Sequence, residues 1–197
     1  MKKLILASQS PRRKMLLEQV GVPFTVFSSD VDETIDTDAE PAEIVQILAA
    51  RKADQVARQL TGTPDAVVLA ADTVVVLQNQ VLGKPKDRNH AFEMLQKLQN
   101  KWHEVMTGIV VVDIATGERL DHVEKTRVRV RPLTPGAIWN YIDSGEPLDK
   151  AGAYGIQGLG ALLVEKIEGC YFNVVGLPIY SVSVMLSRVG IKTFLDR

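Results

Sequence analysis

Apolar runs typical of strands and helical repeats of apolar positions follow one another along the whole chain. Residues 66–71 form an apolar run without polar alternation, as expected of a fully buried strand. Residues 105–113 and 119–131 predict a long hairpin. Further strands are expected at 3–8, 24–28, 74–77, 81–82 and 161–167. Helices are expected at 11–20, from 41 onward, at 87–98, from 134 to near 145 and at 176–190. Because a hairpin accompanies strand–helix units, we expect an α/β fold with a mixed central sheet flanked by helices, in one domain over residues 1–197.

The first predicted strand leads directly into a basic helix start. Ser10 is a favourable N-cap and Pro11 suits the first helical position. Arg12, Arg13 and Lys14 lie in the first turn, where positive charge is unfavourable for the helix dipole. The free N–H groups and these cations together favour an anion, and phosphate is the obvious candidate. A basic surface turn is the alternative.

Composition narrows the classes of protein. The hydrophobic share of 46% and the charged share of 24% are ordinary for a soluble globular chain. A formal net charge of −1 lacks the basic surplus of a general nucleic-acid binder. No N-terminal apolar segment is long enough for a signal peptide or a membrane span, so we expect a cytoplasmic protein without a membrane partner.

Few residues could hold a soft metal ion. Cys170 is the single cysteine and the chain has three histidines, which excludes an internal disulfide and disfavours a His/Cys metal site. A divalent ion would therefore be held by carboxylates, which indicates Mg²⁺ or Mn²⁺. The acidic segment 30–40 either is a solvated loop or supplies one or two ligands to such an ion. The sequence does not show which of its six acidic residues, Glu33 among them, would be the ligands.

Asp72 follows the buried run 66–71, where the strand is expected to end. Ligand sites in α/β sheets gather at the carboxyl ends of strands. Because another apolar run follows in place of a helix, we favour a functional role over a helix cap or a turn.

Two lysines and a glutamine are candidate ligand contacts. Lys52 lies in mid-helix between apolar residues four positions away, so its stem is expected to be buried and its head group to have a defined position. Lys84 lies in a stiff Gly-Lys-Pro segment, and Gln157 lies in the glycine-rich stretch 151–160, where it could read the edge of a base. Salt bridges, solvent exposure and a bulged strand connection are the alternatives.

Arginines alternate with valines in the second arm of the hairpin, at Arg127, Arg129 and Arg131. Such a face suits either a phosphate groove or a solvated sheet edge, and the edge is the more common explanation.

Several short motifs stand in order along nearly the whole chain. They are Leu-Ala-Ser-x-Ser-Pro-Arg-Arg at 6–13, Asp-Glu at 32–33, Leu-Ala-x-x-Lys at 48–52, Ala-Asp-Thr-Val at 71–74, Gly-Lys-Pro at 83–85, Asp-Lys-Ala-Gly-Ala-Tyr-Gly-Ile-Gln-Gly at 149–158 and Val-Gly-Leu-Pro at 175–178. Together they resemble the Maf family of nucleotide pyrophosphatases. The resemblance implies a fold related to inosine triphosphate pyrophosphatases. It also implies hydrolysis of a nucleoside triphosphate to the monophosphate and pyrophosphate with a divalent metal, Mg²⁺ or Mn²⁺.

The resemblance also implies roles for individual residues. Glu33 and Asp72 would be the metal and water-activating carboxylates, with Asp72 as the catalytic base. The phosphate contacts would be Ser8, Arg12, Arg13, Lys52 and Lys84.

Three positions separate branches of the family with different bases. Arg12, Thr73 and Gln157 match the branch that resembles dTTP/UTP pyrophosphatases, and the 7-methyl-GTP branch typically has an aromatic residue, Gln and an acid there. Thr73 and Gln157 therefore join the expected substrate contacts. We expect a house-cleaning hydrolase for dTTP and UTP, with no nucleic-acid partner, and the choice between canonical and modified pyrimidine nucleotides stays open. A nucleotide-binding regulator of cell division with little turnover is the alternative, and the oligomeric state is left open, a homodimer included.

Overall fold

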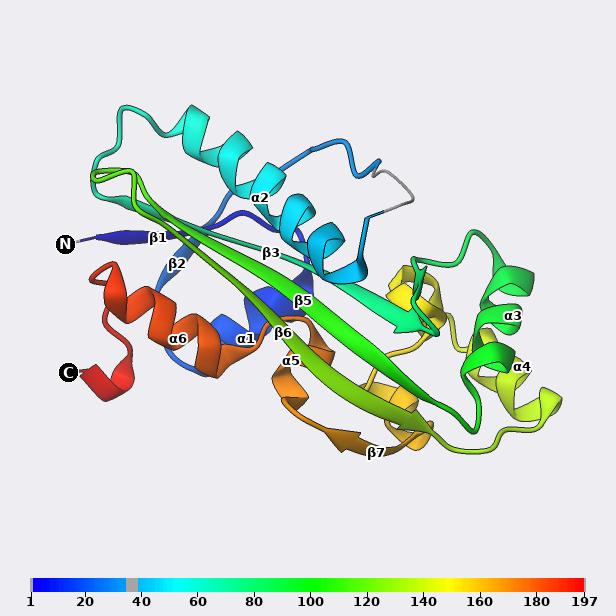
Figure 1. Ribbon diagram of the computed structural model, residues 1–197. Coiled ribbons are helices and arrows are strands. Elements are labelled where there is room, and N and C mark those ends of the chain that lie inside the picture. Colours follow the sequence, from blue (N-terminus) through cyan, green and yellow to red (C-terminus); the bar gives the residue numbers. More distant parts are fainter. Residues whose placement is uncertain (1, 35–38, 197) are drawn as a thin grey trace. The chain divides into compact units, whose positions relative to one another are not determined.

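The computed structural model describes residues 2–34 and 39–196 (Figure 1). The chain forms two compact units, each built from separated segments. The first comprises Met1–Asp72, Thr107–Glu124 and Gly176–Arg197, and the second comprises Thr73–Met106 and Lys125–Val175. Three strands pass from one unit into the other along the sequence. The organisation as one domain over 1–197 stays a prediction.

Seven strands form a mixed sheet. They are β1 (Lys3–Leu6), β2 (Phe24–Val26), β3 (Ala66–Leu77), β4 (Gln80–Leu82), β5 (Trp102–Asp113), β6 (Arg119–Val130) and β7 (Val164–Glu168), in the order β2-β1-β3-β5-β6-β7 with β4 paired to β3. The pairs β1–β2 and β1–β3 are parallel, whereas β3–β4 and β6–β7 are antiparallel. The predicted mixed sheet is confirmed, and so is the long hairpin, as β5 and β6.

The described helices are α1 (Pro11–Gln19), α2 (Pro41–Gln59), α3 (Arg88–Leu98), α4 (Pro135–Asp143), α5 (Tyr171–Val175) and α6 (Ile179–Arg188). Short 3₁₀ turns add η1 (Glu146–Asp149), η2 (Ala151–Ala153), η3 (Gly158–Leu162) and η4 (Phe194–Asp196). Local capping explains several starts: the side chain of Asp87 accepts from the amide of His90, and that of Thr134 accepts from the amide of Ala137. None of the described helices is long and apolar enough to cross a membrane.

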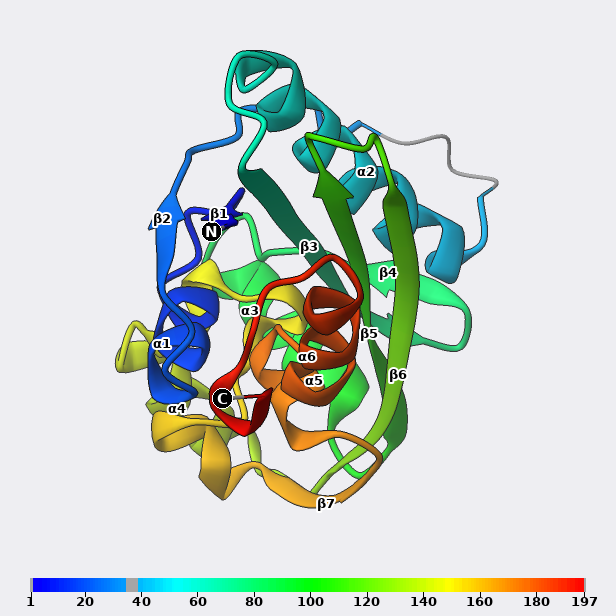
Figure 2. The ribbon, with the colours of Figure 1, turned by 90° about the vertical axis from the view of Figure 1, so that its left-hand side faces the viewer.

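In the first unit, α2 lies on one face of the sheet, and α1 and α6 lie on the other (Figures 1 and 2). Small residues of α2, Ala49 and Ala53, are fully buried against the sheet. The approach is so close that a Cβ on Gly108 of β5 would lie 2.4 Å from the carbonyl oxygen of Val45. This close packing fixes α2, and with it Lys52, against the strands.

In the second unit, α3 and α4 pack side by side (Figure 1). The ring of Phe92 stacks on that of Trp139 with centroids 4.8 Å apart. Nearby, the Nε2 atom of buried His103 lies 2.6 Å from the hydroxyl of buried Tyr154. This core supports the glycine-rich stretch that follows α4.

Two strand predictions need correction. β3 does not end at residue 71 but runs unbroken through Asp72 and Thr73 to Leu77, because two polar residues are accommodated inside an otherwise apolar strand. The strand predicted at 161–167 begins only at Val164, because residues 158–162 form a 3₁₀ turn.

The arginine face of β6 is also not at a sheet edge, because β7 pairs with β6 there. Arg127 pairs with Glu168 at 2.6 Å and Arg129 with Glu165 at 3.2 Å. These ion pairs between neighbouring strands account for both arginines without a phosphate groove.

Candidate active site

The turn between β1 and α1 holds a buried arginine. The Nε atom of Arg13 donates to the carbonyl of Gly176 at 2.8 Å, and its Nη1 atom donates to Ser8 Oγ at 3.3 Å. Ser8 Oγ also accepts from the amide of Ser10 at 3.2 Å. Ser10 is the N-cap as predicted, but its side chain accepts no capping hydrogen bond. The first turn of α1 therefore has no cap from the Ser10 side chain and lies beside a guanidinium that two hydrogen bonds hold in place.

The pKa of Arg13 is lowered, with burial as the largest cause. The charge of Asp72 opposes this effect, the charge of Arg12 adds to it, and the charge of Glu33 opposes it. An arginine side chain nevertheless remains charged. The four side chains therefore share one electrostatic environment, in which two cations and two carboxylates influence one another. In the sequence these four residues lie in three separate segments.

Lys52 joins the two carboxylates. Its Nζ atom lies 2.6 Å from Asp72 Oδ1 and 2.8 Å from Glu33 Oε1. The side chains of Lys52 and Asp72 are 12% and 13% exposed, whereas that of Glu33 is 62% exposed. The predicted buried stem and fixed head group of Lys52 are thus observed, with the head group held by two acids.

Residues of α2 hold the acidic loop in place. Arg51 Nη1 donates to the carbonyls of Asp32 and Thr34 at 2.8 and 2.7 Å, and Gln55 Nε2 donates to the carbonyl of Asp30 at 2.7 Å. These bonds to the loop backbone place Glu33 next to Lys52. Asp36 and Asp38, two of the other acids in this segment, lie outside the described residues.

Asp72 owes its position to the end of a neighbouring strand. β1 pairs with β3 in parallel only as far as Leu69, so Asp72 lies just past that pairing, near the carboxyl end of β1. The rule that ligand sites gather at strand ends therefore applies to β1 and not to β3.

The carboxylate pair fits a hard divalent cation. In the described part of the chain, no group of three or more His, Cys, Asp or Glu side chains is arranged to hold a metal ion. Glu33 and Asp72 nevertheless direct one oxygen each at a single cationic group. Mg²⁺ in phosphate-binding enzymes commonly takes one or two protein carboxylates and completes its shell with phosphate oxygens and water, so this donor set suits it.

The other predicted site residues, Thr73, Lys84 and Gln157, belong to the second unit. Thr73 follows Asp72 in β3, and successive side chains of a strand point to opposite faces. Lys84 is exposed beside buried Pro85, and the carbonyl of the preceding Gly83 accepts from the amide of Gly152 at 3.0 Å. This bond joins the Lys84 segment to the glycine-rich stretch that carries half-buried Gln157.

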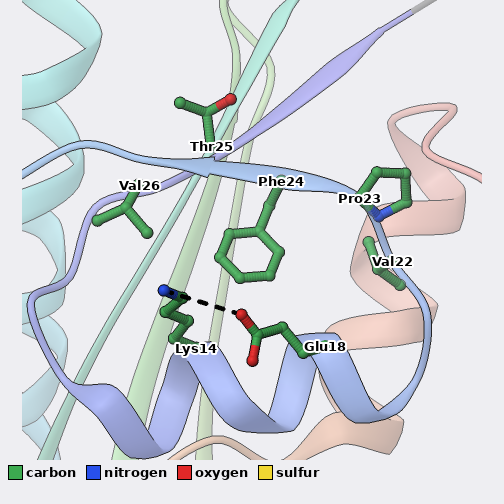
Figure 3. Close-up of a pocket in the computed structure, with 7 residues that line it drawn as sticks. All are labelled: Lys14, Glu18, Val22, Pro23, Phe24, Thr25 and Val26. Carbon is green, nitrogen blue, oxygen red and sulfur yellow. Dashed lines mark ion pairs between the residues drawn. The ribbon is translucent and has the colours of Figure 1, made fainter.

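Lys14, the third cation of the basic turn, faces a different pocket, between α1 and β2 (Figure 3). Its Nζ atom lies 3.9 Å from Glu18 Oε1, one helical turn away. Apolar side chains of residues 22–26 line much of the remainder. The structure thus separates Lys14 from the group around Arg13.

Sequence reasoning missed the carbonyl of Gly176. The segment Val-Gly-Leu-Pro at 175–178 was a motif without an assigned contact, although a glycine before Leu-Pro signals an unusual backbone. Gly176 has φ of 124°, a conformation that favours glycine, and its carbonyl fixes the guanidinium of Arg13.

The sequence matches the family described as Maf-like protein over residues 3–189. The chain belongs to the Maf family. Among curated Maf relatives, the dTTP/UTP pyrophosphatase of Halalkalibacterium halodurans is 53% identical over 193 residues, covering 98% of this chain and 99% of that protein. The dTTP/UTP pyrophosphatase of Acetivibrio thermocellus is 48% identical over 196 residues, covering 98% of each. The resemblance noted in the sequence motifs is therefore confirmed at the level of the family.

Among solved structures, the Ham1 protein of Staphylococcus aureus aligns with a TM-score of 0.47 and 17% identity, covering 66% of this chain and 72% of that one.

Proposed function

We propose that this protein hydrolyses dTTP and UTP to the monophosphate and pyrophosphate. The observation that carries the proposal is the gathering, within one unit, of Ser8, Arg13, Lys52 and the carboxylates of Glu33 and Asp72. Membership of the Maf family supports it, as do full-length relatives at 45–53% identity named dTTP/UTP pyrophosphatase.

The cationic part of the site suits a triphosphate. A guanidinium presents several N–H donors in one plane, and Arg13 uses its Nε and one Nη1 hydrogen bond to fix its own position. Arg12, Arg13 and Lys52 would offset the charge of the phosphates and of the pyrophosphate that leaves. Lys84 is proposed as a further phosphate contact on the basis of its position in the family motif alone. Ser8 holds Arg13 in place and can itself donate its hydroxyl.

The acidic part suits activation of water. Glu33 and Asp72 would hold Mg²⁺ or Mn²⁺, and the ion when bound would polarise the α-phosphate and lower the pKa of water. Asp72 would accept the proton of the attacking water. Lys52, held between both acids, offsets their mutual repulsion. No covalent intermediate with the protein is required.

Selection of the base is assigned to the second unit. Gln157 has an amide that both donates and accepts, which complements the alternating acceptors and donor on the edge of uracil and thymine. Thr73 is proposed as a further substrate contact, on the basis of its position in the family motif alone.

The test is a panel of dTTP, UTP, CTP and GTP, each with Mg²⁺ or Mn²⁺, with every product identified. The proposal expects pyrophosphate and monophosphate, fastest from dTTP and UTP. Orthophosphate with a nucleoside diphosphate would instead indicate removal of the terminal phosphate. Binding of the nucleotides without turnover would instead support the alternative of a nucleotide-binding regulator of cell division. The enzymatic names of the relatives do not favour that alternative.

A further inference from the structure

Gln157 stands in the middle of a backbone segment that two residues outside it hold at both ends. The amide of Gly155 donates to the hydroxyl of Tyr141, and the amides of Leu159 and Gly160 donate to the carboxylate of Glu146. The three held amides lie two residues before Gln157 and two and three residues after it. Tyr141 and Glu146 therefore determine the course of the chain on both sides of the proposed base-reading amide.

Glu146 makes three hydrogen bonds with its carboxylate. Its Oε2 atom accepts from the amide of Leu159 at 2.8 Å, and its Oε1 atom accepts from the amide of Gly160 at 2.9 Å and from Tyr141 Oη at 2.9 Å. Because all three donors point at oxygen, the site needs a carboxylate, and an amide in its place would set two N–H groups against each other.

Tyr141 links the two ends of the segment. Its hydroxyl donates to Glu146 and accepts from the amide of Gly155 at 3.2 Å. The ring is buried at the end of α4, with 5% exposure, so the hydroxyl has a fixed position. Burial first, and then the hydrogen bond to Glu146, raise the pKa of Tyr141, which keeps the hydroxyl a neutral donor.

The neighbouring glycines leave room for the carboxylate. Gly158 has φ of 60°, and a Cβ there would lie 2.6 Å from Glu146 Oε2. A Cβ on Gly160 would lie 2.0 Å from the carbonyl oxygen of Gly155 and 2.8 Å from Tyr141 Oη. The glycine-rich composition of this stretch thus matches the close approach of Glu146 and Tyr141 to its backbone.

Burial alone would raise the pKa of Glu146, but the amides of Leu159 and Gly160 and the Tyr141 hydroxyl together lower it. The carboxylate is therefore ionised in the neutral pH range. Its hydrogen bonds to two backbone amides are charge-assisted, which makes them stronger than neutral ones.

We propose that Glu146, together with Tyr141, is a positioning residue for base discrimination, which holds the segment 155–160 so that the Gln157 amide meets uracil and thymine in one orientation. The inference rests on the proposed function and adds to it a pair of residues that touch no substrate. Precise placement matters here because a polar group discriminates best between bases when its neighbours fix its orientation.

The first experiment replaces Glu146 with Gln and measures kcat and KM separately for dTTP, UTP, CTP and GTP. We expect the preference for dTTP over CTP, as a ratio of kcat/KM, to fall by about tenfold, because the Gln157 amide loses its single orientation. The matched control is Glu165→Gln, which neutralises an acid of the same unit that pairs with Arg129 on the neighbouring strand. Its preference should equal that of the wild type.

The second experiment asks whether Glu146 acts through Gln157. In a Gln157→Ala background, Glu146→Gln should change the preference no further, because the group that it positions is gone. Tyr141→Phe leaves the two amide bonds of Glu146 intact and should lower the preference in the same direction. If the Glu146→Gln variant unfolds below the assay temperature, the nucleotide preference of the Tyr141→Phe variant tests the proposal in its place.

The outcomes separate this inference from the proposed function. A wild-type enzyme without pyrophosphate release from dTTP overturns both. A wild-type enzyme that prefers dTTP, with folded Glu146→Gln and Tyr141→Phe variants that keep that preference, overturns only the role of Glu146. A general loss of kcat for every nucleotide with an unchanged preference also contradicts it, since that result indicates a merely structural contact.

Discussion

Replacing Lys52 with methionine tests the carboxylate pair directly. The substitution keeps much of the length of the side chain and removes the ammonium that lies 2.6 Å from Asp72 Oδ1 and 2.8 Å from Glu33 Oε1. Two acids that share one cation in the wild type are then left facing each other. The folded variant should be destabilised by their repulsion.

The magnitude follows from the geometry. Two unit charges roughly 5 Å apart repel by about 1 kcal/mol in water and by about 3 kcal/mol at an effective dielectric constant of 20. Because the Glu33 side chain is 62% exposed, the lower part of this range applies. A loss of about 1–2 kcal/mol lowers the Tm of a chain of this size by about 2–8 °C.

Mg²⁺ should restore what the substitution removes. When Glu33 and Asp72 bind the ion, the variant gains more from it than the wild type does, because in the wild type the ion competes with Lys52. Saturation at a hundred times Kd adds about 2.7 kcal/mol to stability. The assay is thermal unfolding of both proteins over a series of MgCl₂ concentrations, with NaCl holding the ionic strength constant.

Two controls make the result specific. Lys14→Met removes an exposed lysine that pairs with Glu18, and its response to Mg²⁺ should equal that of the wild type. A Lys52→Met/Glu33→Gln double variant should lose the additional response. Equal responses to Mg²⁺ in the wild type and in Lys52→Met would refute the assignment of these acids as metal ligands.

Three further predictions concern single residues. Asp72→Asn should lower kcat for dTTP by at least about a hundredfold with a near-native Tm, because the base is lost while Glu33 still balances Lys52; a folded variant with full turnover removes Asp72 from the mechanism. Gln157→Glu should narrow the rate differences among dTTP, UTP, CTP and GTP, because a carboxylate cannot donate as the amide does; unchanged relative rates argue against base reading there. Burial lowers the pKa of His103 from 6.5 to about 4. Between about pH 6.5 and 4, the His103 imidazole therefore binds a proton in the unfolded chain but not in the folded one. The free energy of unfolding should fall by at most about 3 kcal/mol as the pH falls through that window. Chemical unfolding at several pH values should show this fall in the free energy of unfolding for the wild type and a smaller fall for His103→Gln. If the free energies of both proteins depend on pH in the same way, His103 is not the cause of the fall.

Much of the fold was predictable because its signals are local. Pro41 and Pro135 mark helix starts, and the turn at Gln78 and Asn79 has both residues at positive φ, as a two-residue hairpin turn of type I′ requires. The end of β3 was not predictable, because a polar Asp-Thr pair resembles a turn locally. Only the tertiary structure shows that the strand continues through it.

The candidate site divides in the same way. The contact between Ser8 and Arg13 spans only five positions within one turn, and the motif at 6–13 named both residues, though not their contact. The partners of Lys52 are twenty positions away or nearly so, and the carbonyl that fixes Arg13 is 163 positions away. Such contacts depend on how α2 and the segment around Gly176 pack, which neither spacing nor composition encodes. Glu146 escaped notice for the same reason, since two of its three partners, the amides of Leu159 and Gly160, lie beyond the 3₁₀ turn that it begins.

In the proposed reaction, water attacks the innermost phosphorus of the nucleotide. Hydrolysis of dTTP in ¹⁸O-labelled water, followed by mass spectrometry of both products, tests this point of attack most directly. One labelled oxygen is expected in the thymidine monophosphate and none in the pyrophosphate. Label in the pyrophosphate, or in free orthophosphate, would contradict it.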